Sequence, residues 1–163
     1  MLLFEKDFCE FTEDEVHKLL CNMGSIINED YINDVLSEKE NHIVFYSIDD
    51  TNDIYNCPSS LIYNVERNKN TINVYILFIA TAYRFRKVGY ASLFIKEFIM
   101  FIKEKYYKNK KTKVQIILDS IVEAVTFYEH YGFNWVITDE YNKKFKIPED
   151  SDIEHFIMIY DVN

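Results

Sequence analysis

Hydrophobic residues recur at helical spacing in four stretches of the chain. The first begins at Thr12, where Glu15 three residues later completes a capping-box pattern. Gly24 is placed to end this helix in a left-handed conformation, and Gly132 is placed to end the last one. The four predicted helices cover residues 12–24, 29–37, 90–105 and 121–131.

Runs of β-branched and aromatic residues between these helices predict strands. The acidic, Asn-bearing stretch Asp49–Asn56 is interpreted as a loop, and Arg67–Asn70 as a polar turn between two long strands. The resulting order is strand, two helices, three strands, helix, strand, helix and two strands, which predicts a mixed α/β sheet with helices on its faces. No repeat or linker interrupts it, so we expect a single domain over residues 1–163. The predicted strands cover residues 2–4, 42–48, 60–66, 71–80, 113–118, 133–139 and 153–161.

Charge is distributed unevenly along the chain, whose net charge is −9. The segment Arg84–Lys113 has ten Lys and Arg against two acidic residues, while the first 53 residues carry −11. The overall acidic excess argues against a nucleic-acid partner, because phosphate contacts need clustered Lys and Arg. The basic segment could serve a phosphorylated cofactor and the acidic part a cationic substrate. The alternative is that both are only solvated faces.

No metal site and no membrane span are expected. The three cysteines and four histidines are scattered without the spacing of metal ligands, which makes the cysteines reduced packing residues. The longest apolar runs are far too short to cross a bilayer, and the first residues have no basic-then-apolar leader. We therefore expect a cytoplasmic protein.

One stretch between the long strand and the long helix suggests a phosphate site. It reads Arg86-Lys-Val-Gly89-Tyr-Ala91, in a chain with only three Gly and four Ala residues. A turn at a helix amino terminus presents unpaired backbone amides and the positive end of the helix dipole. Small residues at positions 89 and 91 let the backbone approach an anion closely, so we expect a pyrophosphate to bind here.

This stretch resembles the acyl-CoA loop of the GCN5-related N-acetyltransferases, whose pattern is Arg/Gln-x-x-Gly-x-Gly/Ala. A second segment, Ala124-Val-Thr-Phe-Tyr128-Glu-His-Tyr-Gly132-Phe133, is similar to the later signature of the same family. The two segments occur in the family's order and separation, and the resemblance covers roughly residues 42–162. It implies a mostly antiparallel central sheet flanked by helices, with the fourth and fifth strands splayed apart.

The resemblance also implies acetyl-CoA as cosubstrate and a set of site residues. The pantetheine arm would pair with the end of the fourth strand, and loop amides would hold the pyrophosphate. Tyr128 stands where the family has the tyrosine that protonates the departing thiolate; the alternative is that it only packs in the core. The residues implied to bind acetyl-CoA are Ile79, Ala80, Thr81, Arg86, Lys87, Val88, Gly89, Tyr90 and Ala91.

Two departures from the family's pattern leave the proton acceptor open. The predicted fourth strand has no carboxylate, so Asp119 at the end of the fifth strand is the nearest candidate base, with Glu123 behind it. A chain of water molecules is an equal alternative. Ile121 stands where the family often has an Asn that contacts CoA, and Ser120 is the one neighbour that could compensate.

The predicted function is transfer of an acetyl group to a primary amine by direct attack on the thioester. The acceptor would be a small molecule or the lysine or N-terminal amine of a peptide, and the acidic segment favours a cation. A homodimer is compatible with this prediction. The alternative is an acyl-CoA-binding module that has lost catalysis, with a purely structural protein ranked last.

Overall fold

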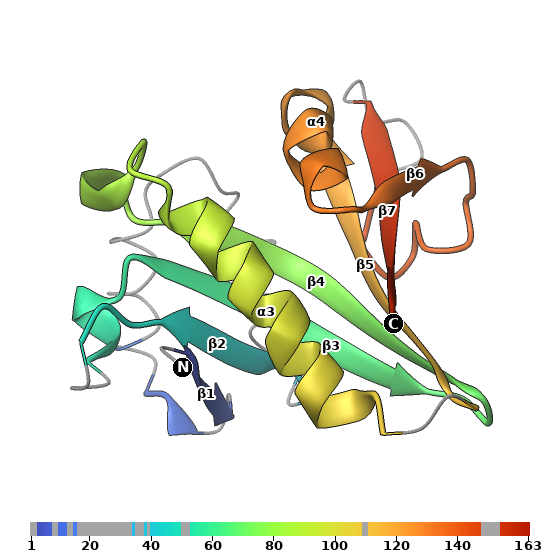
Figure 1. Ribbon diagram of the computed structural model, residues 1–163, viewed down its shortest axis with the longest axis horizontal. Coiled ribbons are helices and arrows are strands. Elements are labelled where there is room, and N and C mark those ends of the chain that lie inside the picture. The colour runs from blue at the N-terminus through green and yellow to red at the C-terminus, as the bar shows by residue number, and fades with distance from the viewer. Residues whose placement is uncertain are drawn as a thin grey trace. The chain divides into compact units, whose positions relative to one another are not determined.

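The computed structural model describes residues 3–7, 10–12, 15, 34, 38, 40–49, 53–108, 111–147 and 154–163. Figure 1 shows its helices and strands in chain order. The elements are β1 (Leu3–Asp7), β2 (His42–Tyr46), the 3₁₀ helix η2 (Ile54–Asn56), β3 (Ser59–Arg67), β4 (Thr71–Thr81), the 3₁₀ helix η3 (Tyr83–Phe85), α3 (Tyr90–Tyr106), β5 (Lys113–Ile121), α4 (Val122–His130), β6 (Asn134–Val136) and β7 (His155–Val162).

The strands follow the order β1-β2-β3-β4-β5-β7-β6. The β1–β2, β2–β3, β5–β7 and β6–β7 pairs are antiparallel, while β4 and β5 are parallel. A parallel pair needs a crossover connection, which α3 supplies. The α/β fold class is therefore confirmed: a mixed, mostly antiparallel sheet with helices.

The ladder between β4 and β5 stops before either strand ends. It runs from the pair Thr71–Lys113 to the pair Ile76–Leu118, while β4 continues to Thr81 and β5 to Ile121. The expected splay of the fourth and fifth strands requires that β4 and β5 stop pairing before they end, as they do here.

The contacts of the chain divide it into two compact units, each described here by itself. The first consists of Met1–Asn64 with Phe78–Phe101, and the second of Val65–Leu77 with Ile102–Asn163. Strands β3 and β4 and helix α3 contribute residues to both units. The single domain over residues 1–163 stays a prediction.

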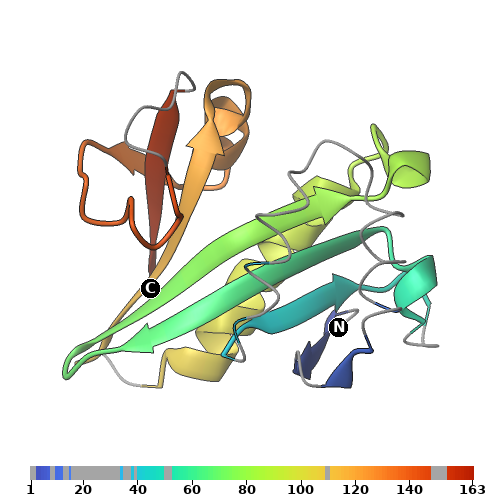
Figure 2. The same ribbon diagram turned by 180° about the vertical axis from the view of Figure 1, so that it is seen from behind.

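In the first unit, α3 packs on one face of β2 and β3. The helix lies in front of these strands in Figure 1 and behind them in Figure 2. Phe94 and Phe98, one helical turn apart, are fully buried, and their rings lie 6.0 Å from Tyr46 and 5.4 Å from Tyr63. The apolar spacing that predicted this helix is therefore the spacing of its packed face.

In the second unit, α4 contacts β5, β6 and β7 and ends in a Schellman motif. The amide of Phe133 donates to the carbonyl of Tyr128 (3.2 Å), and that of Gly132 donates to Glu129 (2.9 Å). Gly132 has a φ of 90°, a left-handed conformation that glycine adopts without a steric penalty. The rings of Tyr128 and Phe133, whose centroids are 5.7 Å apart, provide the hydrophobic contact of the motif.

Two element predictions are corrected. Residues 133–139 were expected to form a strand, but β6 ends at Val136, and the next side chain, Ile137, is 90% exposed. The stretch read as a loop contains the short helix η2, because the side chain of Asp53 accepts a hydrogen bond from the amide of Tyr55 and caps it.

The capping box at residue 12 is confirmed. The amide and hydroxyl of Thr12 donate to the Glu15 carboxylate (2.9 and 3.0 Å), and the Glu15 amide donates to the Thr12 hydroxyl (3.3 Å). The remainder of the helices predicted over 12–24 and 29–37 lies outside the described residues, apart from the helical Asp34. Among the helices that the structure describes, none has the length and apolarity needed to cross a membrane.

Candidate active site

The predicted phosphate loop, residues 86–91, belongs to the first unit and turns through two left-handed residues. Lys87 has a φ of 64° and Gly89 a φ of 90°. A Cβ added at Gly89 would meet nothing within 4 Å, so the backbone conformation, and not crowding, selects glycine. Lys87 has no such freedom, and left-handed geometry costs a non-glycine residue about 1 kcal/mol.

The loop leads directly into the amino terminus of α3. The first hydrogen bond of the helix joins the amide of Leu93 to the carbonyl of Gly89 (3.1 Å). The amides that precede Leu93 in the first turn have no acceptor within the helix, and they lie at the positive end of its dipole. Because Lys87, Val88 and Gly89 are exposed, this amide cluster can meet an anion from solvent.

Arg86 ties the loop to the end of β4. Its Nε donates to the carbonyl oxygen of Thr81 (3.0 Å), and the hydroxyls of Thr81 and Ser59 are 2.8 Å apart. The amide of Ala82 donates to the carbonyl of Pro58 (2.8 Å), which fixes the end of β4 to the start of β3. The structure thus brings the predicted loop and the predicted pantetheine segment, Ile79 to Thr81, together in one unit.

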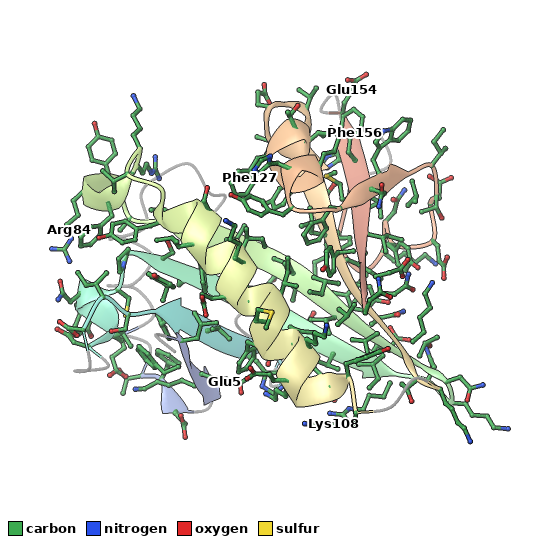
Figure 3. All side chains as sticks on the ribbon, viewed as in Figure 1. Glu5, Arg84, Lys108, Phe127, Glu154 and Phe156 are labelled. Atoms are coloured by element: carbon green, nitrogen blue, oxygen red, sulfur yellow. The ribbon has the colours of Figure 1, made fainter. Side chains whose placement is uncertain are left out.

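Some charged and aromatic side chains around the loop make contacts within the protein, and others are exposed to solvent. Arg84 donates from Nη2 to the carbonyl of Tyr55 (2.7 Å), and Figure 3 shows it on the side of η2. The ring of Tyr90 lies 5.6 Å from Phe85 and 6.2 Å from Tyr46, so it packs against the first unit. Lys87 is therefore the exposed cation of the predicted pyrophosphate-binding residues.

Tyr128, the predicted proton donor, lies on α4 in the second unit and is 7% exposed. Burial raises the pKa of its phenol to about 12. A free thiol has a pKa of about 8.5, so proton transfer from this phenol to a solvated thiolate is uphill by about 5 kcal/mol. The transfer becomes feasible where the thiolate is desolvated as well, because desolvation raises its basicity too.

Asp119, the predicted base, is bonded to a histidine that the sequence interpretation did not select. Oδ2 of Asp119 lies 2.7 Å from Nδ1 of His155, and the two side chains are 19% and 22% exposed. Burial raises the pKa of Asp119, while the hydrogen bond and charge of His155 oppose that rise. Its other oxygen, Oδ1, is buried and has no hydrogen-bond partner among the described residues.

Strand register brings this pair together. In the antiparallel β5–β7 ladder, Ile121 is opposite His155 and Asp119 is opposite Ile157, so Asp119 and His155 share a face at adjacent diagonal positions. The available signal was an Asp near the end of one predicted strand and a His near the start of the last. The contact between the two side chains could be predicted only with the register of the two strands, which the sequence does not give.

A pocket of about 330 Å³ lies beside this pair. It is formed by β6, the segment after it and the start of β7, and His155 is one of its lining residues. Figure 3 labels Glu154 and Phe156, which flank His155 in the sequence and also line the pocket.

The other candidates near Asp119 do not join the pair. Ser120, which could have replaced the missing Asn, is buried and donates its hydroxyl to the carbonyl of Ile121 (2.9 Å). Glu123 is exposed at the start of α4.

The described residues include neither a cluster of metal ligands nor an activated thiol. Within them, no group of three His, Cys, Asp or Glu side chains could hold a metal ion. Cys57 is buried, its Sγ lies 3.3 Å from the carbonyl of Asp53, and burial raises the pKa of its thiol to about 12. A thiol in this state is a packing group, since the thiolate is the reactive form.

Comparison with known proteins identifies the fold. No family model and no curated protein matches the sequence. Arabidopsis thaliana Naa50, solved in complex with the bisubstrate analogue CoA-Ac-MVNAL, is 14% identical over 98% of this chain and 99% of that chain, with a TM-score of 0.59. A GNAT-family protein from Desulfovibrio desulfuricans is 15% identical over 99% and 98% (TM-score 0.63), and Tetrahymena GCN5 is 11% identical over 93% and 91% (TM-score 0.61). The chain therefore has the fold of the GCN5-related N-acetyltransferases.

Proposed function

We propose that this protein transfers the acetyl group of acetyl-CoA to a primary amine. The observation that carries this proposal is the loop of residues 86–91, which presents the first amides of α3 to solvent in a chain with this fold. A pyrophosphate fits that arrangement, because the amides donate hydrogen bonds and the helix dipole favours negative charge.

The acetyl-CoA-binding residues are those implied by the sequence. The amides from Lys87 to Ala91 hold the pyrophosphate, with Lys87 adding positive charge, while the amide of Arg86 donates to the carbonyl of Tyr83 (3.2 Å). Arg86 contributes through its bond to Thr81, which keeps the loop against the end of β4. The backbone of Ile79, Ala80 and Thr81 provides the pairing groups for the pantetheine arm. A backbone amide near the thioester would polarise its carbonyl, as donors do in an oxyanion hole.

The chemistry is direct attack of a neutral amine on the thioester carbonyl. The attack forms the C–N bond and releases the CoA thiolate, which takes a proton. Tyr128 is the donor for that proton. Asp119, whose carboxylate is bonded to His155, is the candidate acceptor for the proton of the amine.

The acceptor class is a primary amine that is protonated in solution. Naa50 was solved with an analogue that joins CoA to a peptide, which supports an N-terminal amine as one member of this class. A lysine side chain, a polyamine and an aminoglycoside are the others, and the charge of −11 on the first 53 residues favours such cations.

The test combines binding with turnover. Isothermal titration with acetyl-CoA and with CoA measures cofactor binding, and ADP serves as the control for phosphate affinity alone. Release of free thiol is then followed over a panel of spermidine, kanamycin, a lysine-containing peptide and a peptide with a free amino terminus. Binding of acetyl-CoA with amine-dependent thiol release is the expected result, and the absence of binding would contradict the proposal.

The second candidate is a binding module that holds acetyl-CoA without turnover. One observation favours it: the described β4 has no carboxylate, and its hydroxyl at Tyr75 is bonded to Asn73 and Glu66. Tight binding of acetyl-CoA without thiol release for any amine of the panel would support this candidate instead.

A further inference from the structure

The ladder between β6 and β7 places two aromatic side chains on one face of the second unit. Trp135 is opposite Met158, so Phe156, two residues before Met158, lies on the same face at the adjacent diagonal position. The two ring centroids are 6.3 Å apart, and the ring planes meet at 84°. Trp135 remains 49% exposed. The rings therefore form a corner that is open to solvent.

This aromatic corner lines the pocket of about 330 Å³ described above, whose lining residues all belong to the second unit. Its volume falls within the range of about 300–1,000 Å³ that is typical of ligand sites. The start of β7, which forms one side of the pocket, is fixed to β5 by the 2.7 Å contact between Asp119 and His155. A small organic group can therefore enter a site whose walls are held in place.

The pocket carries fixed negative charge. Asp139 and Glu154 line it, and none of the described Lys or Arg residues does. Nδ2 of Asn142, another lining residue, donates to Oδ1 of Asp139 (3.2 Å) and orients that carboxylate. Lys144 follows closely in the sequence, but its Nζ lies 5.1 Å from the centroid of the Tyr75 ring. The two carboxylates raise the local concentration of a cation and disfavour an anion.

Aromatic walls together with carboxylates suit one kind of cation in particular. The faces of Trp and Phe rings attract a positive charge, and this attraction is the usual means of recognising quaternary ammonium groups. A primary ammonium is compact and strongly hydrated, so it loses more by leaving water for an aromatic surface. Methyl groups on the nitrogen reduce that hydration and increase contact with the rings. The pocket therefore favours an ammonium group whose hydrogens are replaced by alkyl groups.

We propose that this pocket binds the alkylated ammonium group of an organic cation. Trp135 and Phe156 contact its methyl groups, and the carboxylates of Asp139 and Glu154 balance its charge. A quaternary ammonium has no free amine to acetylate, so this site is a binding function beyond acetyl transfer. The inference uses residues of the second unit alone and does not depend on the proposed reaction.

The chain carries its own reporter for this site, because Trp135 is its single tryptophan. Titration with choline at constant ionic strength should change the tryptophan fluorescence in a saturable way. Dimethylbutanol, the uncharged carbon isostere of choline, should bind at least about tenfold more weakly, since it lacks the charge that the rings and carboxylates attract. Ethanolamine, the primary ammonium analogue, should also bind more weakly than choline.

Single substitutions separate the two contributions to binding. Glu154→Gln should weaken choline binding about threefold through loss of one exposed carboxylate. Phe156→Leu should weaken it by about the same factor through loss of one ring face. Glu129→Gln, exposed on α4 and outside the pocket, removes the same charge as Glu154→Gln and should change the affinity less than about twofold. The melting temperature of each variant shows whether the fold is kept.

Several results would overturn the inference. They are the absence of a saturable signal at millimolar choline, equal binding of dimethylbutanol, and ethanolamine binding at least as tight as that of choline. Unchanged choline affinity in folded Glu154→Gln and Phe156→Leu variants would place the fluorescence change outside this pocket. If either variant fails to fold, the comparison of choline with dimethylbutanol on the wild-type protein still decides.

Discussion

At the scale of single residues, Gly89 provides a test of the proposed cofactor site. Its φ of 90° and the open space around it mean that a side chain would project toward solvent, where the pyrophosphate is proposed to bind. Gly89→Val should therefore lower acetyl-CoA affinity at least about tenfold, through strain in the turn and loss of close approach. Isothermal titration measures the change.

The matched control for this variant is Lys87→Gly, at the other left-handed position of the loop. It relieves strain and removes one charge, so it should weaken binding far less than Gly89→Val. Equal affinity of Gly89→Val and the wild type would remove the loop from the proposed site.

Tyr128 gives a prediction about kcat and its pH dependence. Tyr128→Phe should lower kcat about 100-fold with little change in acetyl-CoA binding, the behaviour expected when a general acid is lost. Because burial raises its pKa to about 12, the phenol stays protonated at every working pH. The ratio of wild-type to variant kcat should therefore be constant from pH 7 to pH 10.

Steady-state kinetics of both proteins at several pH values make this test. A kcat unaffected by Tyr128→Phe, under conditions where chemistry limits the rate, would mean that Tyr128 only packs against Phe127 and Phe133.

At the scale of elements, Gly132 controls how α4 ends and where β6 begins. Its φ is 90°, and a Cβ there would meet Cε2 of Tyr160 at 3.2 Å, so both conformation and space select glycine. Gly132→Ala should lower the free energy of unfolding by about 1–2 kcal/mol. Urea denaturation measures this, with the exposed Glu129→Ala on the same helix as a control expected to change stability by less than about 0.5 kcal/mol.

Most elements could be predicted because their signals are local. The apolar spacing of α3 and the glycine after α4 depend on neighbours within a few residues. The ends of strands depend on distant partners instead. β5 extends beyond the predicted Leu118 to Ile121 because β7 pairs with it there, whereas β6 ends at Val136, where its pairing with β7 ends.

The difference between local and long-range signals also explains which parts of the candidate site could be predicted. The turn and the helix start of the predicted phosphate loop could be read from the sequence, because the residues that signal them are contiguous. His155 could not, because its link to Asp119 depends on the register of two strands that α4 and β6 separate in the chain.

At the scale of the whole molecule, the charge distribution predicts which amines react best. The first 53 residues carry −11 against a net charge of −9, so this acidic segment should attract cations and repel anions. We expect kcat/KM to be higher for spermidine than for glutamate. We also expect the value for spermidine to fall between 0.02 and 0.5 M salt, because exposed charges are screened over about 8–10 Å near physiological salt.

Kinetics of both amines at low and high ionic strength test this prediction. A preference for glutamate, or no salt dependence with spermidine, would show that the acidic residues serve solvation only.

Because the thiol of Cys57 is buried, its rate of chemical modification can measure local opening of the structure around it. Cys57 precedes Pro58, whose carbonyl holds the end of β4 through Ala82, so a reagent can reach its sulfur only when this corner opens. In a variant with Cys9→Ser and Cys21→Ser, the labelling rate divided by that of a free thiol gives a protection factor, and hence the free energy of opening. A ligand that pairs with the end of β4 should raise this factor by 1 + [L]/Kd, where [L] is the free ligand concentration. Saturating acetyl-CoA would then slow the modification of a cysteine that is not among the residues predicted to bind it.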